Sequence, residues 1–94
     1  MPTQKSTQTP STDSIADPVA RSVRLQYFAQ LRTERGCAQE TRMSTANTPE
    51  SLFMEIFGRL PVGIQFAIND RLVLANTPLN EHDTVSFLPP FGGG

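Results

Sequence analysis

Residues 48–60 read TPESLFMEIFGRL, and this stretch decides the fold because it predicts the one substantial helix of the chain. Thr48 is a good N-cap, and Pro49 is favoured at the first helical position. Gly58 and Pro61 mark the frayed end of the helix. Fully burying a large apolar side chain contributes roughly 1.5–3 kcal/mol. The principal part of the core is therefore expected from the apolar residues that recur at helical spacing, namely Leu52, Phe53, Ile56, Phe57 and Leu60.

Two strand patterns precede this helix. Residues 23–28 alternate apolar and polar side chains, as a half-buried strand does. Residues 40–43 form a second, shorter strand candidate. Between them, residues 29–35 predict a short helix that Gly36 closes in the position typical after a helix C-terminus.

Three more strand patterns follow the helix. Residues 64–68 and 72–74 predict a hairpin around a tight turn at 69–71, and residues 84–88 predict a last strand. One long helix packed across a mixed sheet of four or five strands is the α+β arrangement called the β-grasp. The sequence therefore predicts a β-grasp domain.

Composition divides the chain into three parts. Residues 1–22 are rich in Ser, Thr, Pro and Gln and too poor in apolar residues to offset the entropy of ordering, so they are expected to form a disordered leader. Residues 23–88 form the predicted β-grasp domain. Residues 89–94 form an extended tail that begins with two prolines and ends with three glycines.

Charge and hydropathy exclude several classes of function. A net charge of −1 and a pI near 5.7 give no basic footprint for a nucleic acid. No apolar run approaches the roughly 20 residues that cross a bilayer, so no membrane association is expected. The first residues lack the apolar region of a secretory signal, which favours a cytoplasmic protein.

No catalytic or metal-binding constellation can be assembled from the sequence. Cys37 is the only cysteine, and it reads as a small incidental residue in a turn-like stretch. His82 lies between Glu81 and Asp83 without a second histidine or cysteine nearby, which favours a solvated loop residue. Paired carboxylates, a Ser-His-Asp set and a phosphate loop are missing as well. We therefore expect no metal, no bound cofactor and no enzymatic activity of the chain alone.

The tail carries the most distinctive chemistry. Pro89 and Pro90 cannot donate ladder hydrogen bonds, so the chain is expected to leave the sheet stiffly. Glycine lacks a Cβ, which lets residues 92–94 thread a narrow tunnel. The carboxylate of Gly94 is ionised at neutral pH and is a poor electrophile until a partner activates it, for instance as an acyl-adenylate. A frayed end is the alternative interpretation of a glycine run taken alone.

Residues 23–94 closely resemble the small subunit of molybdopterin synthase, a family of ubiquitin-like sulfur carriers. The resemblance rests on Tyr27-Phe28-Ala29-Gln30-Leu31-Arg32 after the first strand, on the segment 76–85, and on Phe87-Leu88-Pro89-Pro90-Phe91-Gly92-Gly93-Gly94. Two positions depart from the family pattern. Phe91 replaces a valine, which bears on how the tail seats in its tunnel, and His82 replaces a glycine, which bears on loop geometry.

The resemblance implies a complete reaction scheme. A ubiquitin-activating-like adenylyltransferase and sulfurtransferase would use ATP to adenylate Gly94, and a persulfide donor would convert it into a thiocarboxylate. The tail, Pro89 through Gly93, would then enter the large catalytic subunit and deliver sulfur to cyclic pyranopterin monophosphate in molybdenum cofactor biosynthesis. Two carriers on a dimer of large subunits would make a 2:2 heterotetramer.

A docking surface is predicted beside the tail. Phe28 and Leu88 are apolar, yet alternation puts them on the strand face opposite the core. By motif position, the hydrophobic trio that binds the family's partner falls on Phe28, Leu72 and Leu88. Three alternatives remain open: a sulfur carrier of another pathway such as thiamine synthesis, a ubiquitin-like modifier conjugated through Gly94, and a passive β-grasp interaction module.

Overall fold

The helix predicted from residues 48–60 is α3, Pro49–Phe57, in the computed structural model, which describes residues 19–90. A reciprocal capping box starts it: the Thr48 hydroxyl accepts a hydrogen bond from the Ser51 N–H, and the Ser51 hydroxyl accepts one from the Thr48 N–H. Gly58, in the left-handed conformation with φ 71°, ends it. The prediction that Leu60 belongs to the core stripe is wrong, because the helix stops first and leaves Leu60 60% exposed.

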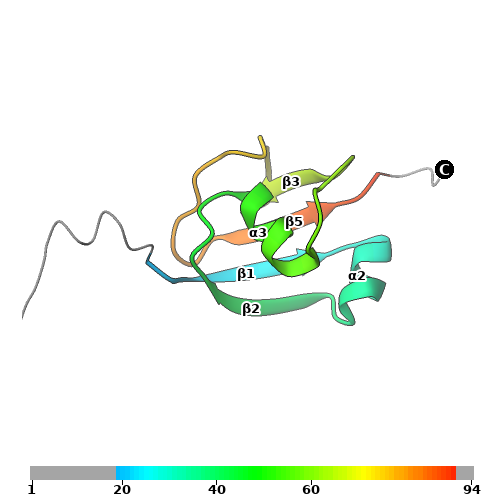
Figure 1. Cartoon of the computed structure of the whole chain (residues 1–94), viewed down its shortest axis with the longest axis horizontal. Helices are drawn as coiled ribbons and strands as arrows, with labels where there is room; N and C mark the ends of the chain where they lie inside the picture. Colours follow the sequence, from blue (N-terminus) through cyan, green and yellow to red (C-terminus); the bar gives the residue numbers. More distant parts are fainter. Residues whose placement is uncertain (1–18, 91–94) are drawn as a thin grey trace, which may run out of the picture.

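Five strands form one mixed sheet in the order β2-β1-β5-β3-β4 (Figure 1). The central strands β1 and β5 run parallel, and every other neighbouring pair is antiparallel. The prediction of an α+β β-grasp fold is confirmed. The elements are β1 Arg21–Tyr27, α2 Ala29–Arg35, β2 Gln39–Ser44, α3, β3 Gln65–Ile68, β4 Arg71–Val73 and β5 Thr84–Leu88.

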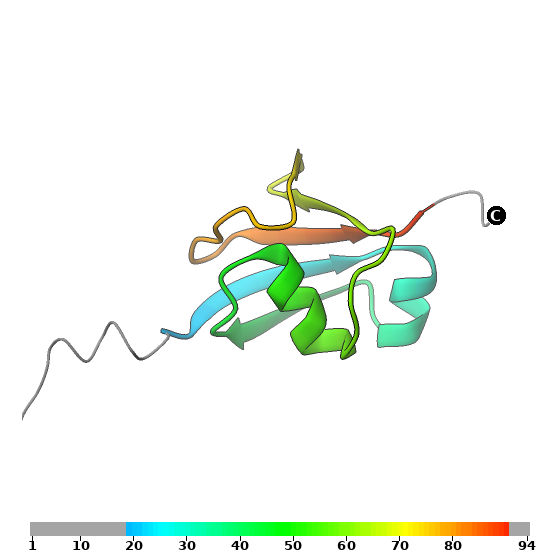
Figure 2. The same ribbon diagram turned by 45° about the horizontal axis from the view of Figure 1, so that its top comes forward.

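The core lies between α3 and one face of the sheet, as Figure 2 shows. Phe87 of β5 is fully buried at its centre, with ring centroids 5.3 Å from Phe53, 5.8 Å from Phe66 and 6.0 Å from Tyr27. Offset and edge-on ring contacts of this kind add to the apolar area that each ring buries. The other core residues are Val23, Leu25, Leu31, Leu52, Leu79 and Val85.

The folded chain starts earlier than the sequence indicated. β1 begins at Arg21, so residues 21 and 22, which we assigned to the leader, pair with Ser44 and Met43 of β2. The Arg21 guanidinium also donates to the Leu79 carbonyl at 2.7 Å. The polar side chains of residues 21 and 22 give no strand pattern in the sequence. The backbone hydrogen bonds that make these residues part of β1 do not depend on their side chains. Residues 1–18 of the predicted leader lie outside the described residues.

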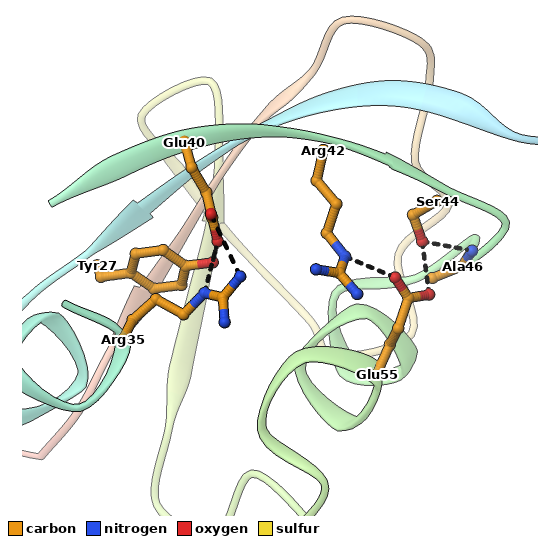
Figure 3. Close-up of polar contacts among 7 residues, drawn as sticks. All are labelled: Tyr27, Arg35, Glu40, Arg42, Ser44, Ala46 and Glu55. Carbon is orange, nitrogen blue, oxygen red and sulfur yellow. Dashed lines mark hydrogen bonds and ion pairs between the residues drawn. The ribbon is translucent and has the colours of Figure 1, made fainter. Parts of the chain in front are cut away.

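The edge strand β2 is held by polar contacts rather than by apolar burial (Figure 3). Glu40 accepts hydrogen bonds from the Tyr27 hydroxyl and from Arg35 of α2, the latter at 2.7 Å. Further along β2, Arg42 donates to Glu55 of α3 at 2.7 Å. The side chains that β2 turns toward the helices, Glu40, Arg42 and Ser44, are therefore charged or polar, which explains why its sequence lacks a clear strand pattern.

The hairpin of β3 and β4 turns through Asn69 and Asp70, both in the left-handed region with φ 52° and 70°. Two consecutive residues in this region form the tight turn of a two-residue hairpin, because the twist of that turn matches the twist of the strands. Glycine adopts the left-handed conformation most readily, followed by Asn and Asp. β4 starts at Arg71 and ends before Leu74, so both of its ends lie one residue earlier than predicted. Within residues 19–90, the structure contains no helix with the length and apolar character of a membrane span.

Candidate functional site

The parallel pairing of β1 and β5 brings two predicted docking residues together. Tyr27 is in register with Phe87 in the core-facing row, so Phe28, which directly follows β1, and Leu88, the last residue of β5, lie at the same end of the sheet. Both point to the face opposite α3, which we call the open face. Phe28 is 41% exposed and Leu88 is half-buried.

The third predicted residue, Leu72, joins them across the sheet. Its partner in register is Ala67 of β3, which in turn pairs with Ser86 of β5. Leu72 is 64% exposed. Together the three residues line one cavity of about 220 Å³, which we call the docking depression; its other lining residues are Gln26, Ala67, Asp70 and Ser86.

Small side chains create the depression. Ala67 and Ser86 lie next to each other in the sheet, and both are buried under the larger side chains around them. The Ser86 hydroxyl donates to the Gln26 side-chain carbonyl at 2.8 Å, so its polar atom is satisfied. This floor is not evident from the sequence pattern alone. The sequence does place a small residue at an outward position of each of these two strands. Only the strand register shows that the two residues are neighbours.

The other half of the open face is polar. A wider hollow of about 460 Å³ lies over β1, β2 and β5, lined among others by Arg24, Gln39, Thr41 and Thr84. It adjoins the docking depression because Gln26 lines both. A partner on the open face thus meets an apolar region near the end of β5 and a polar region behind it.

The tail begins at the apolar end of this face. Of the predicted tail, residues 89–94, the structure describes Pro89, which is fully buried, and Pro90, which is exposed. Burial of a ring with a fixed φ anchors the point where the tail starts. Phe91, Gly92, Gly93 and Gly94 lie outside the described residues.

The loop before β5 is fixed by one buried carboxylate. Asp83 accepts hydrogen bonds from the Asn80 N–H at 2.8 Å and from the Asn69 side-chain amide at 3.0 Å. His82 has φ 69°, a conformation that glycine adopts without cost, and its N–H donates to the Ser22 carbonyl at 2.7 Å. His82 is exposed, as predicted for a loop residue. Its position explains why a glycine would suit this turn.

The shifted pKa values belong to ion pairs on the helix side of the sheet. The hydrogen bond from Arg35 is the main reason that the pKa of Glu40 lies below its usual value. Burial raises the pKa of Tyr27, and the hydrogen bond to Glu40 raises it further. For Glu55, burial alone would raise the pKa, but the hydrogen bonds from Arg42 and Ser44 outweigh it and lower the value.

The feature that the described residues form on the open face is the apolar depression. Within 19–90, no group of three or more His, Cys, Asp or Glu residues is arranged to hold a metal ion. Cys37 is half-buried and packs against the core cluster. This depression lies beside the buried Pro89 at which the tail starts.

A β-grasp sheet with its helix on one face and a C-terminal segment leaving the central strand defines the class of ubiquitin-like proteins. The profile of the ThiS family matches residues 25–94, and the chain belongs to that family of ubiquitin-like sulfur carriers. The resemblance drawn from the tail and strand motifs is thereby confirmed at the level of the carrier family.

Several solved structures share the fold. The small archaeal modifier protein SAMP1 from Methanosarcina acetivorans is 18% identical with a TM-score of 0.64, covering 80% of this chain and 98% of that chain. A putative molybdopterin converting factor subunit 1 from Pyrococcus furiosus is 24% identical with a TM-score of 0.61, covering 74% and 98%. The HVO 2177 protein from Haloferax volcanii is 20% identical with a TM-score of 0.68, covering 83% and 91%. No curated protein matches the chain.

Proposed function

We propose that this chain is the sulfur carrier subunit of molybdopterin synthase. The observation that carries the proposal is the docking depression of Phe28, Leu72 and Leu88 beside the root of the tail. Because Leu88 both lines the depression and ends β5, a partner that covers the depression also lies at the end of the sheet where the tail, residues 89–94, begins. Docking and insertion of the tail thus become one event.

The chemistry of the proposal takes place at Gly94. A carboxylate carries a full negative charge and resists attack by a nucleophile, so an ATP-dependent enzyme must first turn it into an acyl-adenylate. The outer sulfur of a persulfide donor then attacks the acyl carbon and displaces AMP, which gives an acyl disulfide. A second thiol attacks the donor sulfur of that disulfide, so the thiocarboxylate is released and the donor and the thiol are left joined as a disulfide. The carrier supplies no catalytic side chain in this scheme, since it offers its own chain end as the reactant.

The partner of the carrier form is the large catalytic subunit of molybdopterin synthase. A stable interface buries at least about 1,000 Å², so the docking depression forms only its centre. A few residues near the centre of an interface commonly supply most of its binding energy. The polar half of the open face, with Arg24 and Thr41, serves as the rim. Two carriers on a dimeric large subunit give the 2:2 assembly.

Reconstitution tests the proposal directly. The purified chain is incubated with the activating enzyme, ATP and a persulfide source from the same genome, and then with the large subunit and cyclic pyranopterin monophosphate. We expect molybdopterin to form. A chain that lacks Gly93 and Gly94 is the matched control, because it keeps the complete folded domain and loses only the reactive end.

The alternative functions give different results in the same experiment. A thiocarboxylated chain that supports thiazole synthesis, but not molybdopterin synthesis, would assign it to the thiamine pathway. An isopeptide bond between Gly94 and a lysine of another protein would make it a modifier. An interaction module would lose no function on removal of the last two glycines.

A further inference from the structure

A second apolar hollow lies on the other side of the tail root. Its walls come from α2 and from the connection between α3 and β3, and its volume is about 440 Å³. We call it the helix-side groove; it is lined by Gln30, Leu31, Phe53, Arg59, Leu60, Val62, Ile64 and Pro90. In Figure 2 the connection from α3 crosses beside the end of β5. This groove is separate from the docking depression, with which it shares no lining residue.

The groove has unusually exposed apolar walls. Leu60 is 60% and Val62 is 84% exposed, although both lie beside buried core residues such as Leu31 and Phe53. The connection that carries them has a defined backbone, because the Ile64 N–H donates to the Pro61 carbonyl and Gly63 packs near Pro90. A group of exposed apolar side chains on a defined backbone commonly marks a site that a ligand or another segment covers.

The position of Pro90 identifies the segment. Pro90 is one of the residues that line the groove, and the next residue of the chain is Phe91. Consecutive Cα atoms are about 3.8 Å apart, so the side chain that follows Pro90 is within reach of the groove. Pro89 is fully buried, which fixes the direction from which the tail arrives.

The chemistry of the groove suits an aromatic ring. Arg59 already lies over the rings of Phe53 and Phe57, at 5.8 and 5.4 Å from their centroids, and its ion pair with Glu34 holds it there. A guanidinium in this position attracts a further ring that enters beside it. Leu60 and Val62 supply the aliphatic contacts for such a ring.

We propose that the helix-side groove receives the Phe91 side chain of the same chain, so that the tail has a docked state on the domain. In this state the chain end stays close to its own domain. Insertion into a partner requires the ring to leave, so the docked state competes with insertion and lowers the fraction of carrier that is ready to bind. The sulfur-carrier function proposed above gives the docked state a role, but the docking itself does not depend on that function.

Nuclear magnetic resonance of the full-length chain in isolation tests the docked state. We expect nuclear Overhauser effects between the Phe91 ring protons and the methyl groups of Leu60 and Val62. Val62→Ser should lower the heteronuclear Overhauser effects of the Gly92 and Gly93 amides to those of a free chain end. Leu74→Ser removes a side chain of similar exposure, 77%, outside the groove and should leave those values unchanged.

The same spectra can overturn the proposal. A Phe91 ring without contacts to the groove, or Gly92 and Gly93 values that do not respond to Val62→Ser, would exclude the docked state. Contacts that appear only between differently labelled copies would assign the groove to a second molecule and also refute it. Both readouts use the isolated chain without any partner, so they remain valid if the proposed sulfur transfer fails.

Discussion

Replacing Leu72 with alanine should weaken binding to the large subunit while the domain stays folded. Leu72 is 64% exposed in the free chain. Fully burying a leucine side chain contributes about 1.5–3 kcal/mol, so covering the part that is still exposed contributes about 1–2 kcal/mol. That free energy corresponds to an increase in Kd of about 5- to 30-fold. The free energy of unfolding should change little, because most of the side chain already lies in water.

Isothermal titration calorimetry with the large subunit from the same genome measures the change in Kd, and urea denaturation of the carrier measures its stability. Met43→Ala is the matched control. Met43 is 63% exposed on the same open face, because it follows Thr41 by two residues on β2. It lies on the opposite edge of the sheet from Leu72.

Equal affinity of the wild type and the Leu72→Ala variant would refute the docking depression as the centre of the interface. A weaker affinity of both variants would do so as well, because a general loss of apolar surface would then explain the result. A large drop in the free energy of unfolding with Leu72→Ala would contradict the exposed position of Leu72, on which the expected change in Kd depends.

Three further predictions concern the fold. Phe87→Ala should lower the free energy of unfolding by about 3–5 kcal/mol, because the ring is fully buried among four others, and a loss below about 1 kcal/mol in urea denaturation would contradict the core. Thr48→Ala should cost about 1 kcal/mol through loss of the capping box, and an unchanged stability would exclude that cap. The pKa of Glu40 lies below its ordinary value of 4.5, so its ion pair with Arg35 stabilises the fold above that pH and loses this effect as the pH falls through the lower folded pKa. Glu40→Gln should therefore flatten the acid side of the stability profile, and a profile parallel to that of the wild type would argue against the pair.

Local signals in the sequence predicted the elements that depend on local interactions. The capping residues of α3, the glycine after α2 and the hairpin turn at Asn69 each act within a few residues of themselves. Their predictions agree with the structure to within a few residues. The end of α3 was misjudged at Leu60, because an apolar residue at helical spacing gives no information on whether the backbone is still helical.

Features that depend on pairing between distant strands could not be predicted from the sequence. The start of β1 at Arg21 depends on hydrogen bonds to β2, which the alternation of side chains does not reveal. The floor of the docking depression requires Ala67 and Ser86 to be in register. The resemblance to a family supplied Phe28, Leu72 and Leu88, but only the sheet order explains why these three lie together.

The tail illustrates the same division. Two prolines correctly predicted the end of the last strand, because proline cannot donate a ladder hydrogen bond. The burial of Pro89 was missed, since proline is usually exposed and its environment here is set by the surrounding core. The point where the tail starts is therefore fixed by burial as well as by the proline ring.

The central claim is that the Gly94 carboxylate carries sulfur, and intact mass spectrometry of the chain tests it most directly. The protein is purified from cells that contain its activating enzyme and sulfur donor, and the terminal fragment is sequenced by tandem mass spectrometry. Our account predicts a population in which one oxygen of the Gly94 carboxylate is replaced by sulfur. A terminal carboxylate that stays fully oxygenated in the presence of active partner enzymes would contradict it.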